Sequence, residues 1–381
     1  MSAPLRLSVT GVGLACSLGL NAPDACAAAF AGLTRPGPMP GIDVFDSEEA
    51  VGVDLNVHAV PLLTEGFVDV ARFARLGTAA LADLMSRSEI LDDGKTGICI
   101  ALPSFYHLRR HEEAQAIADD EPPPPEPYAL EADIRTEALR TQLVPTIRRF
   151  SDVSLHPSPG VTLFEGKAGF GSLLLSAARA LQGGAISRCL VGGIDSFLDP
   201  LRVRALEQAG ILLTPDNAAG AMPGEAAAFL LVERAREDSA SPTLEGIELA
   251  QDVPFAPILN EPSEDAELPE PPPRPAGIGL ANCLGTTRAA GLAEIETLYT
   301  SLNGATHRAF DWGCAQVRLS AASPFEPETV HPAMFFGDTG AATGPLAVCL
   351  ADHARQRGWG SSSGVWLASD SGLRSSFRFS S

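Results

Sequence analysis

The segment from Phe164 to Leu198 constrains the fold more than any other part of the chain. Residues 172–182 are apolar or small on nearly every face, which predicts a helix buried on all sides. Gly183-Gly184 ends this helix, and the apolar residues 188–191 that follow predict a short buried strand. The glycine-rich entry at 166–171 predicts a tight turn whose amides face an enclosed spot, where α/β enzymes often place a nucleophile or an anion.

Composition excludes several classes of partner. The chain has 381 residues, 45% of them hydrophobic, which is enough for an extensive core in one large domain or two smaller ones. The formal net charge is −20, and this argues against nucleic acid and anionic membrane surfaces. The same charge disfavours acidic protein partners.

The cysteines predict a reducing compartment and no metal site. There are seven, an odd number, and none is spaced as a CxxC pair or a metal-ligand set. The N-terminus lacks the apolar core of a signal peptide, and no apolar run approaches membrane length. We therefore expect a soluble cytoplasmic protein without a metal or other cofactor.

The first part of the chain has the pattern of an α/β protein. Residues 5–14 alternate as a strand, 68–88 form an amphipathic helix, and 97–102 are a buried strand. Two proline-rich acidic stretches, residues 119–128 and 260–276, are expected to be exposed loops.

The pattern in the last part predicts a second α/β unit. We expect strands at 277–282, 314–320, 365–368 and 376–379.

Three motifs give the chain a family resemblance. They are the helix–glycine–strand segment at 164–198, Gly-Glu-Ala-Ala at 224–227 with Glu233 closing the strand, and Gly-Thr-Thr at 285–287. Together they resemble the β-ketoacyl-acyl-carrier-protein synthases of the thiolase-like superfamily. The resemblance implies a turn and helix at 284–299 and another at 337–354. The resemblance implies an α/β fold of five layers, αβαβα, built from two pseudo-duplicated halves with mixed sheets. It places the halves at residues 1–245 and 246–381.

The same resemblance implies a lost catalytic triad. The position of the family's nucleophilic cysteine holds Lys167, and the two histidine positions hold Cys283 and Asp338. Further pocket candidates that the resemblance implies are Glu165, Gly166, Phe170, Thr286, Thr287 and Leu373. A buried ammonium needs an acidic partner, so we expect Lys167 to pair with Asp338, or with the neighbouring Glu165.

Two functions are compatible with these residues. The first is a non-condensing binding, scaffold or accessory subunit, similar either to chain-length factors or to accessory and loading factors of secretion effectors. The alternative is an acyltransferase that acts on an acyl thioester through Lys167 or Cys283. We favour the first, which is not an enzyme. The resemblance also implies a homodimer, or a heterodimer with a thiolase-fold partner, paired through the β-prone residues 161–164.

Overall fold

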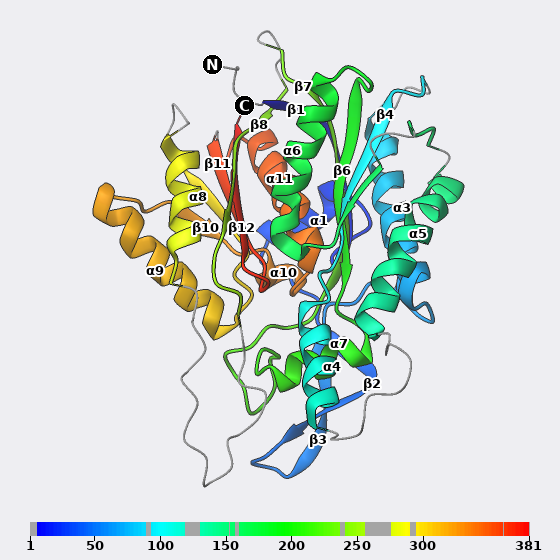
Figure 1. Ribbon diagram of the computed structural model, residues 1–381, viewed down its shortest axis with the longest axis vertical. Coiled ribbons are helices and arrows are strands. Elements are labelled where there is room, and N and C mark those ends of the chain that lie inside the picture. The colour runs from blue at the N-terminus through cyan, green and yellow to red at the C-terminus, as the bar shows by residue number, and fades with distance from the viewer. Residues whose placement is uncertain are drawn as a thin grey trace.

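A computed structural model describes residues 6–88, 93–118, 130–151, 153–156, 160–236, 241–255, 276–289, 295–360 and 362–380. The fold consists of one ten-stranded mixed sheet, a separate two-stranded hairpin and the helices that connect the strands (Figure 1). The proline-rich residues 119–128 and 260–275 lie outside the described residues. Within the described ranges, none of the helices combines the length and apolar character needed to cross a bilayer.

The large sheet has the spatial order β10-β9-β11-β12-β8-β1-β7-β6-β4-β5. In chain order its strands are β1 (Leu7–Cys16), β4 (Thr96–Ala101), β5 (Gly160–Leu163), β6 (Arg188–Ser196), β7 (Glu225–Arg234), β8 (Thr243–Gln251), β9 (Thr297–Thr300), β10 (Glu328–Val330), β11 (Ser362–Ala368) and β12 (Leu373–Ser380). The hairpin is β2 (Gly37–Asp46) and β3 (Val51–Val57).

The helices connect and cover these strands. They are α1 (Ala22–Phe30), α2 (Pro61–Thr64), α3 (Asp69–Arg87), α4 (Tyr106–Ala118), α5 (Glu131–Ser151), α6 (Gly169–Gln182), α7 (Pro200–Gln208), α8 (Ile278–Ala289), α9 (Thr306–Ala322), α10 (Ala333–Phe336) and α11 (Thr343–Gln356). Two 3₁₀ turns, η1 (Gly166–Ala168) and η2 (Gly340–Ala342), lead directly into α6 and α11.

The sheet consists of two halves with the same topology. The first half runs β1-β7-β6-β4-β5 and the second runs β8-β12-β11-β9-β10, so each places its first, fifth, fourth, second and third strand in that order. In both halves the pairs that contain the fifth strand are antiparallel and the others are parallel. The halves join where β1 pairs with β8, Leu7 opposite Leu244. This duplication of topology is not visible as a repeat in the sequence.

Five layers follow from this arrangement. α3 and α5 cover the outside of the first half-sheet, and α8 and α9 cover the outside of the second (Figure 1). α6 and α11 lie between the half-sheets, and each contacts strands of both. The predicted α/β organisation with two pseudo-duplicated halves and mixed strands is therefore present.

The buried central helix differs from the prediction. We expected α6 to be buried on all sides, but Arg179 near its end is exposed and several of its residues are only half-buried. The more deeply buried central helix is α11, in which every residue from 343 to 352 is buried and only the last turn reaches the surface.

Most of the predicted elements of the first half are confirmed, whereas two predicted strands of the second half are wrong. Residues 277–282 lie mainly in α8, and 314–320 lie in α9. A short apolar run does not distinguish a strand from a buried helix, and this ambiguity caused both errors. The predicted helix at 284–299 is also wrong, because α8 ends at Ala289 and β9 begins at Thr297. The predicted boundary at 245–246 falls inside β8, and a division before Thr243 keeps five strands in each half.

Candidate functional site

The two 3₁₀ turns meet at the centre of the molecule and define the site. Each begins with a glycine in the left-handed region, Gly166 with φ 63° and Gly340 with φ 50°. A side chain at Gly340 would place its Cβ 2.0 Å from Oδ2 of Asp195, so both conformation and space require glycine there. The turns bring Lys167 of the first half against residues of the second.

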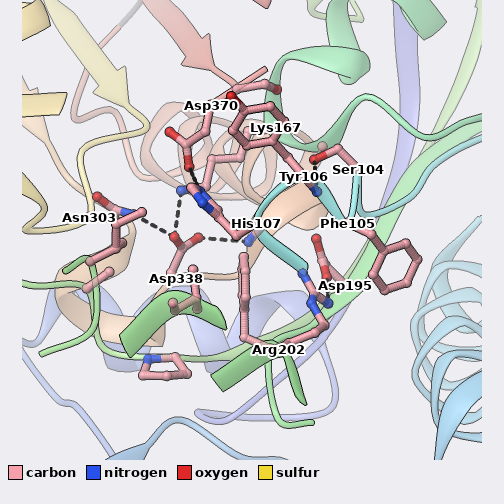
Figure 2. A pocket seen from close by; sticks show the side chains of 18 of the residues that line it. Ser104, Phe105, Tyr106, His107, Lys167, Asp195, Arg202, Asn303, Asp338 and Asp370 are labelled. Carbon is pink, nitrogen blue, oxygen red and sulfur yellow. Dashed lines mark hydrogen bonds and ion pairs between the residues drawn. The ribbon is translucent and has the colours of Figure 1, made fainter. Parts of the chain in front are cut away.

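Lys167 forms the predicted ion pair with Asp338. Its Nζ lies 2.7 Å from Oδ2 of Asp338, and the two side chains are 6% and 9% exposed (Figure 2). Asn303 donates to the same carboxylate oxygen over 2.6 Å, and the backbone N–H of Gly340 donates to Oδ1 over 3.0 Å. The Asp338 carboxylate is thus held by a charged donor and two neutral ones. Glu165, the alternative partner, leaves its buried Oε2 without a hydrogen bond among the described residues.

Burial and charge set the protonation of this pair. Burial raises the pKa of Asp338, but the charges of Lys167 and Arg308 and the hydrogen bonds outweigh it, so the pKa is lowered. Burial and Arg308 lower the pKa of Lys167, against the opposing attraction of Asp338. We describe the site at neutral pH as an ammonium–carboxylate pair, because the 2.7 Å geometry and the additional donors stabilise the carboxylate.

A second carboxylate, Asp370, organises the opposite wall. It accepts hydrogen bonds from Nε2 of His107 over 2.8 Å and from Nε2 of His307 over 2.9 Å. The Arg308 guanidinium lies 2.7 Å from the same group. Burial raises the pKa of Asp370, yet the charge of Arg308 and the hydrogen bonds from His107 and His307 hold it well below its usual range. Burial lowers the pKa of His307, which favours its neutral form.

The cavity between these two carboxylates is small, about 60 Å³, which is room for only a few water molecules. Its polar lining is Ser104, Tyr106, His107, Lys167, Asp195, Arg202, Asn303, Arg308, Asp338, Ser369 and Asp370. No cysteine lines it. Among the residues that the structure describes, no cluster of His, Cys, Asp and Glu has an arrangement that could hold a metal ion.

Several residues predicted for the pocket lie elsewhere. Gly166 lines the cavity, whereas Glu165, Phe170, Thr286, Thr287 and Leu373 do not. Phe170 is buried behind it, with its ring edge-to-face against Phe377. Thr287 bonds to Ser376 from α8.

Cys283 is also outside the cavity. It lies in α8, its Sγ 3.8 Å from the carbonyl oxygen of Arg374. Burial raises the pKa of its thiol to about 12, so the thiol stays protonated at neutral pH. The prediction that Cys283 occupies a position in this site is wrong.

Asn303 is a residue of the Lys167–Asp338 network that the sequence analysis missed. Asn303 lies in the turn after β9, directly before Gly304, and its side chain donates to the carboxylate of Asp338 that also binds Lys167. The predicted helix at 284–299 included most of the residues of β9, so neither this strand nor the turn after it was recognised. Tyr299-Thr300 at the end of a short β-prone run, followed by Asn303-Gly304, was the available signal.

Comparison with known proteins gives a short sequence match and extensive structural matches. A model of the β-ketoacyl synthase N-terminal domain matches residues 171–238. The curated proteins contain no match to this chain. In the structure of the ishigamide ketosynthase/chain length factor, a chain matches with TM-score 0.67 and 15% identity, over 98% of this chain and 99% of that one.

Two further solved structures match over similar lengths. A chain of AntDE:AntF, a type II polyketide synthase acyl-carrier protein in complex with its ketosynthase, matches with TM-score 0.70 and 15% identity over 100% of both chains. A chain of the ketosynthase ApeO in complex with its chain length factor ApeC, from Xenorhabdus doucetiae, matches with TM-score 0.64 and 15% identity, over 100% of this chain and 99% of that one. This chain therefore has the thiolase-like fold of the ketosynthases, with similarity to the ketosynthase N-terminal domain at residues 171–238.

Proposed function

We propose that this protein is a non-condensing, ketosynthase-like subunit that works by binding a partner of the same fold. The observation that carries the proposal is the buried Lys167–Asp338–Asn303 network at the point where the two 3₁₀ turns meet. In ketosynthases, as the sequence resemblance implies, a cysteine occupies the position of Lys167 and a histidine that of Asp338. Asn303 lies beside this pair, where the resemblance had placed Cys283.

The chemistry of this network does not suit condensation. A nucleophile needs a free electron pair, and Asp338 favours the protonated form of Lys167. The cavity of about 60 Å³ has no cysteine in its lining and is too small for an acyl chain. Losing the nucleophile and its partners normally removes many orders of magnitude of rate.

A pairing surface is available at the end of the sheet. β5 is a terminal strand of the ten-stranded sheet, and its residues Val161, Thr162 and Leu163 are half-buried. An edge strand of this kind can pair with a strand of another chain. Two of the structurally similar proteins are ketosynthases described together with a chain length factor. These observations support a heterodimer, while a role beside a secretion effector stays a prediction without such support.

Mass spectrometry of the intact chain tests the enzymatic part of the proposal. The protein is incubated with acyl-coenzyme A and with an acylated carrier protein, each with and without a malonyl extender. We expect no covalent adduct and no condensation product. An adduct that disappears in Lys167→Ala would establish the alternative, an acyltransferase that uses Lys167.

Light scattering tests the pairing through β5. Thr162→Lys places a charge in the middle of β5, and Thr329→Lys makes the same change in β10, the terminal strand at the other end. We expect only Thr162→Lys to reduce association with a co-expressed thiolase-fold partner or with a second copy. Unchanged association in both variants would contradict pairing at β5.

A further inference from the structure

A second cavity lies between α3, α5 and the start of α7. Its volume is about 130 Å³, twice that of the cavity at Lys167. Its apolar lining consists of Val68, Val70, Phe73, Phe105, Ile134, Ala138, Leu139, Leu198 and Pro200. Val68 and Ile134 are 67% and 50% exposed, so the rim includes apolar side chains beside the exposed carboxylates of Asp69 and Glu131.

The charged groups in the wall are neutralised by one another. Arg135 is bonded to Asp199 at 2.7 Å and Glu131 at 2.9 Å, and Asp69 lies at 3.2 Å. Arg72 is paired with Glu225 outside the cavity lining, and Ser196 donates to the same carboxylate.

The remaining charged side chain of the wall, Arg202, is paired with Asp195 at 2.8 Å. The lining therefore holds three arginines and three carboxylates, and each of these side chains already has a partner. A charged ligand would have to break one of these pairs, whereas an uncharged one would not.

Phe105 and Arg202 form the partition between the two cavities. They are the two residues that line both. The Arg202 guanidinium lies over the rings of Phe105 and Phe197, 5.2 Å and 4.2 Å from their centres. It is only 6% exposed and also donates to the carbonyl oxygen of Ser196. The second cavity, which we call the outer cavity, is thus separated from Lys167 by Phe105 and by the Arg202 guanidinium stacked on it, which hydrogen bonds hold in place.

Backbone strain is concentrated around the same cavity. Three non-glycine residues in the described part of the chain have positive φ, and two of them, Asp69 at 45° and Phe105 at 49°, line this cavity. Such conformations cost free energy and persist where the surrounding structure, often a functional site, holds them in place. Phe105 is therefore fixed in an unfavourable backbone conformation with its ring between the two cavities.

We propose that the outer cavity is a binding site for a small uncharged hydrocarbon group, separate from the Lys167 site and independent of the proposed partner role. An apolar cavity of about 150 Å³ in another protein binds benzene. The cavity of about 130 Å³ here accepts a group of similar size, whereas the 60 Å³ cavity at Lys167 does not. The paired charges of the wall favour a neutral ligand over an ionised one.

Thermal unfolding of the full-length protein with toluene tests this proposal, with benzoate as the charged ligand of the same ring size. We expect saturating toluene to raise Tm by about 2–4 °C and benzoate to leave it unchanged. Ala138→Leu fills part of the cavity and should remove at least half of the shift. Ala309→Leu, on the exposed face of α9, is the matched control and should keep it.

A second measurement covers the case in which Ala138→Leu does not fold. Crystals of the wild-type protein under xenon pressure should show density between α3 and α5, beside Phe105. Absence of both the xenon density and the toluene shift would overturn the proposal. An equal shift with benzoate would overturn the assignment of a neutral ligand, and an unchanged toluene shift in a folded Ala138→Leu variant would place the ligand elsewhere.

Discussion

The ammonium of Lys167 lies 2.7 Å from the carboxylate of Asp338, although the two residues are 171 positions apart and come from different halves of the sheet. Each follows the third strand of its half, β5 or β10, and lies at the 3₁₀ turn that leads into the central helix. The duplicated topology therefore brings equivalent regions of the two halves face to face.

Breaking this pair should destabilise the protein strongly. Asp338→Ala leaves the buried ammonium of Lys167 without its counter-ion, and we expect the free energy of unfolding to fall by about 3–5 kcal/mol. The double variant Lys167→Met/Asp338→Leu removes both charges and should recover part of this loss. Glu113→Ala breaks the exposed pair with Arg110 and serves as the control, with an expected change below about 1 kcal/mol. Denaturant unfolding measures all three, and a small effect of Asp338→Ala would show that the pair is dispensable.

A glycine at the site and a glycine within α9 should respond in opposite directions when replaced by alanine. Gly340→Ala introduces a Cβ 2.0 Å from Asp195 at a φ of 50°, and we expect a loss of at least about 2 kcal/mol of stability. Gly313→Ala lies within α9 with no atom within 4 Å of the new Cβ. It should stabilise the protein by about 0.5–1 kcal/mol through helix propensity. Equal effects of the two substitutions on Tm would mean that the turn at Gly340 is not as constrained as described.

Stability should fall between pH 6.5 and pH 4 because of His58. Burial lowers the pKa of this histidine to about 4, while an unfolded histidine titrates near 6.5. In that window the unfolded chain binds the proton and the folded chain does not, so the stability that is complete above pH 6.5 is lost as the pH decreases. The loss from this residue is about 3 kcal/mol. Unfolding measured across the window should show a smaller slope in His58→Gln, and an unchanged slope would assign the effect to other groups.

Thiol reactivity should single out one cysteine. Six of the seven cysteines are buried and Cys314 is partly exposed. Burial also raises the pKa of Cys16 and of Cys283 to about 12, which disfavours the reactive thiolate. A thiol reagent added to the native protein should therefore label one cysteine per chain, and Cys314→Ser should abolish the fast reaction. Rapid labelling of Cys283 would contradict its placement inside α8.

The sequence carried more information about the first half than about the second. Strand 97–102 and helix 68–88 were predictable because their apolar periodicity is regular and glycines or polar residues mark their ends. In α8 the apolar residues 277–282 form a short run without a helical period, and they were taken for a strand. Because of this error, the sequence analysis placed Cys283 at the site, where the structure has Asn303.

The only part of the site that could be predicted was the pair of residues that lie in recognisable sequence motifs. Lys167 and Asp338 lie in glycine-rich motifs with a fixed place in the resemblance, so their contact was expected. His107, His307 and Asp370 come from three separate loops and helix starts, and they meet only in the folded chain. No local pattern in a single sequence records such a meeting, which is why the Asp370 group was not anticipated.

The shared central layer has a consequence for how the chain reaches its native state. α6 belongs to the first half but contacts β8 and β12 of the second, and α11 belongs to the second but contacts β1, β6 and β7 of the first. Neither half can complete its core without a helix from the other. A fragment that ends before Thr243 would therefore expose one face of its sheet and aggregate, and the two halves should unfold in a single cooperative transition.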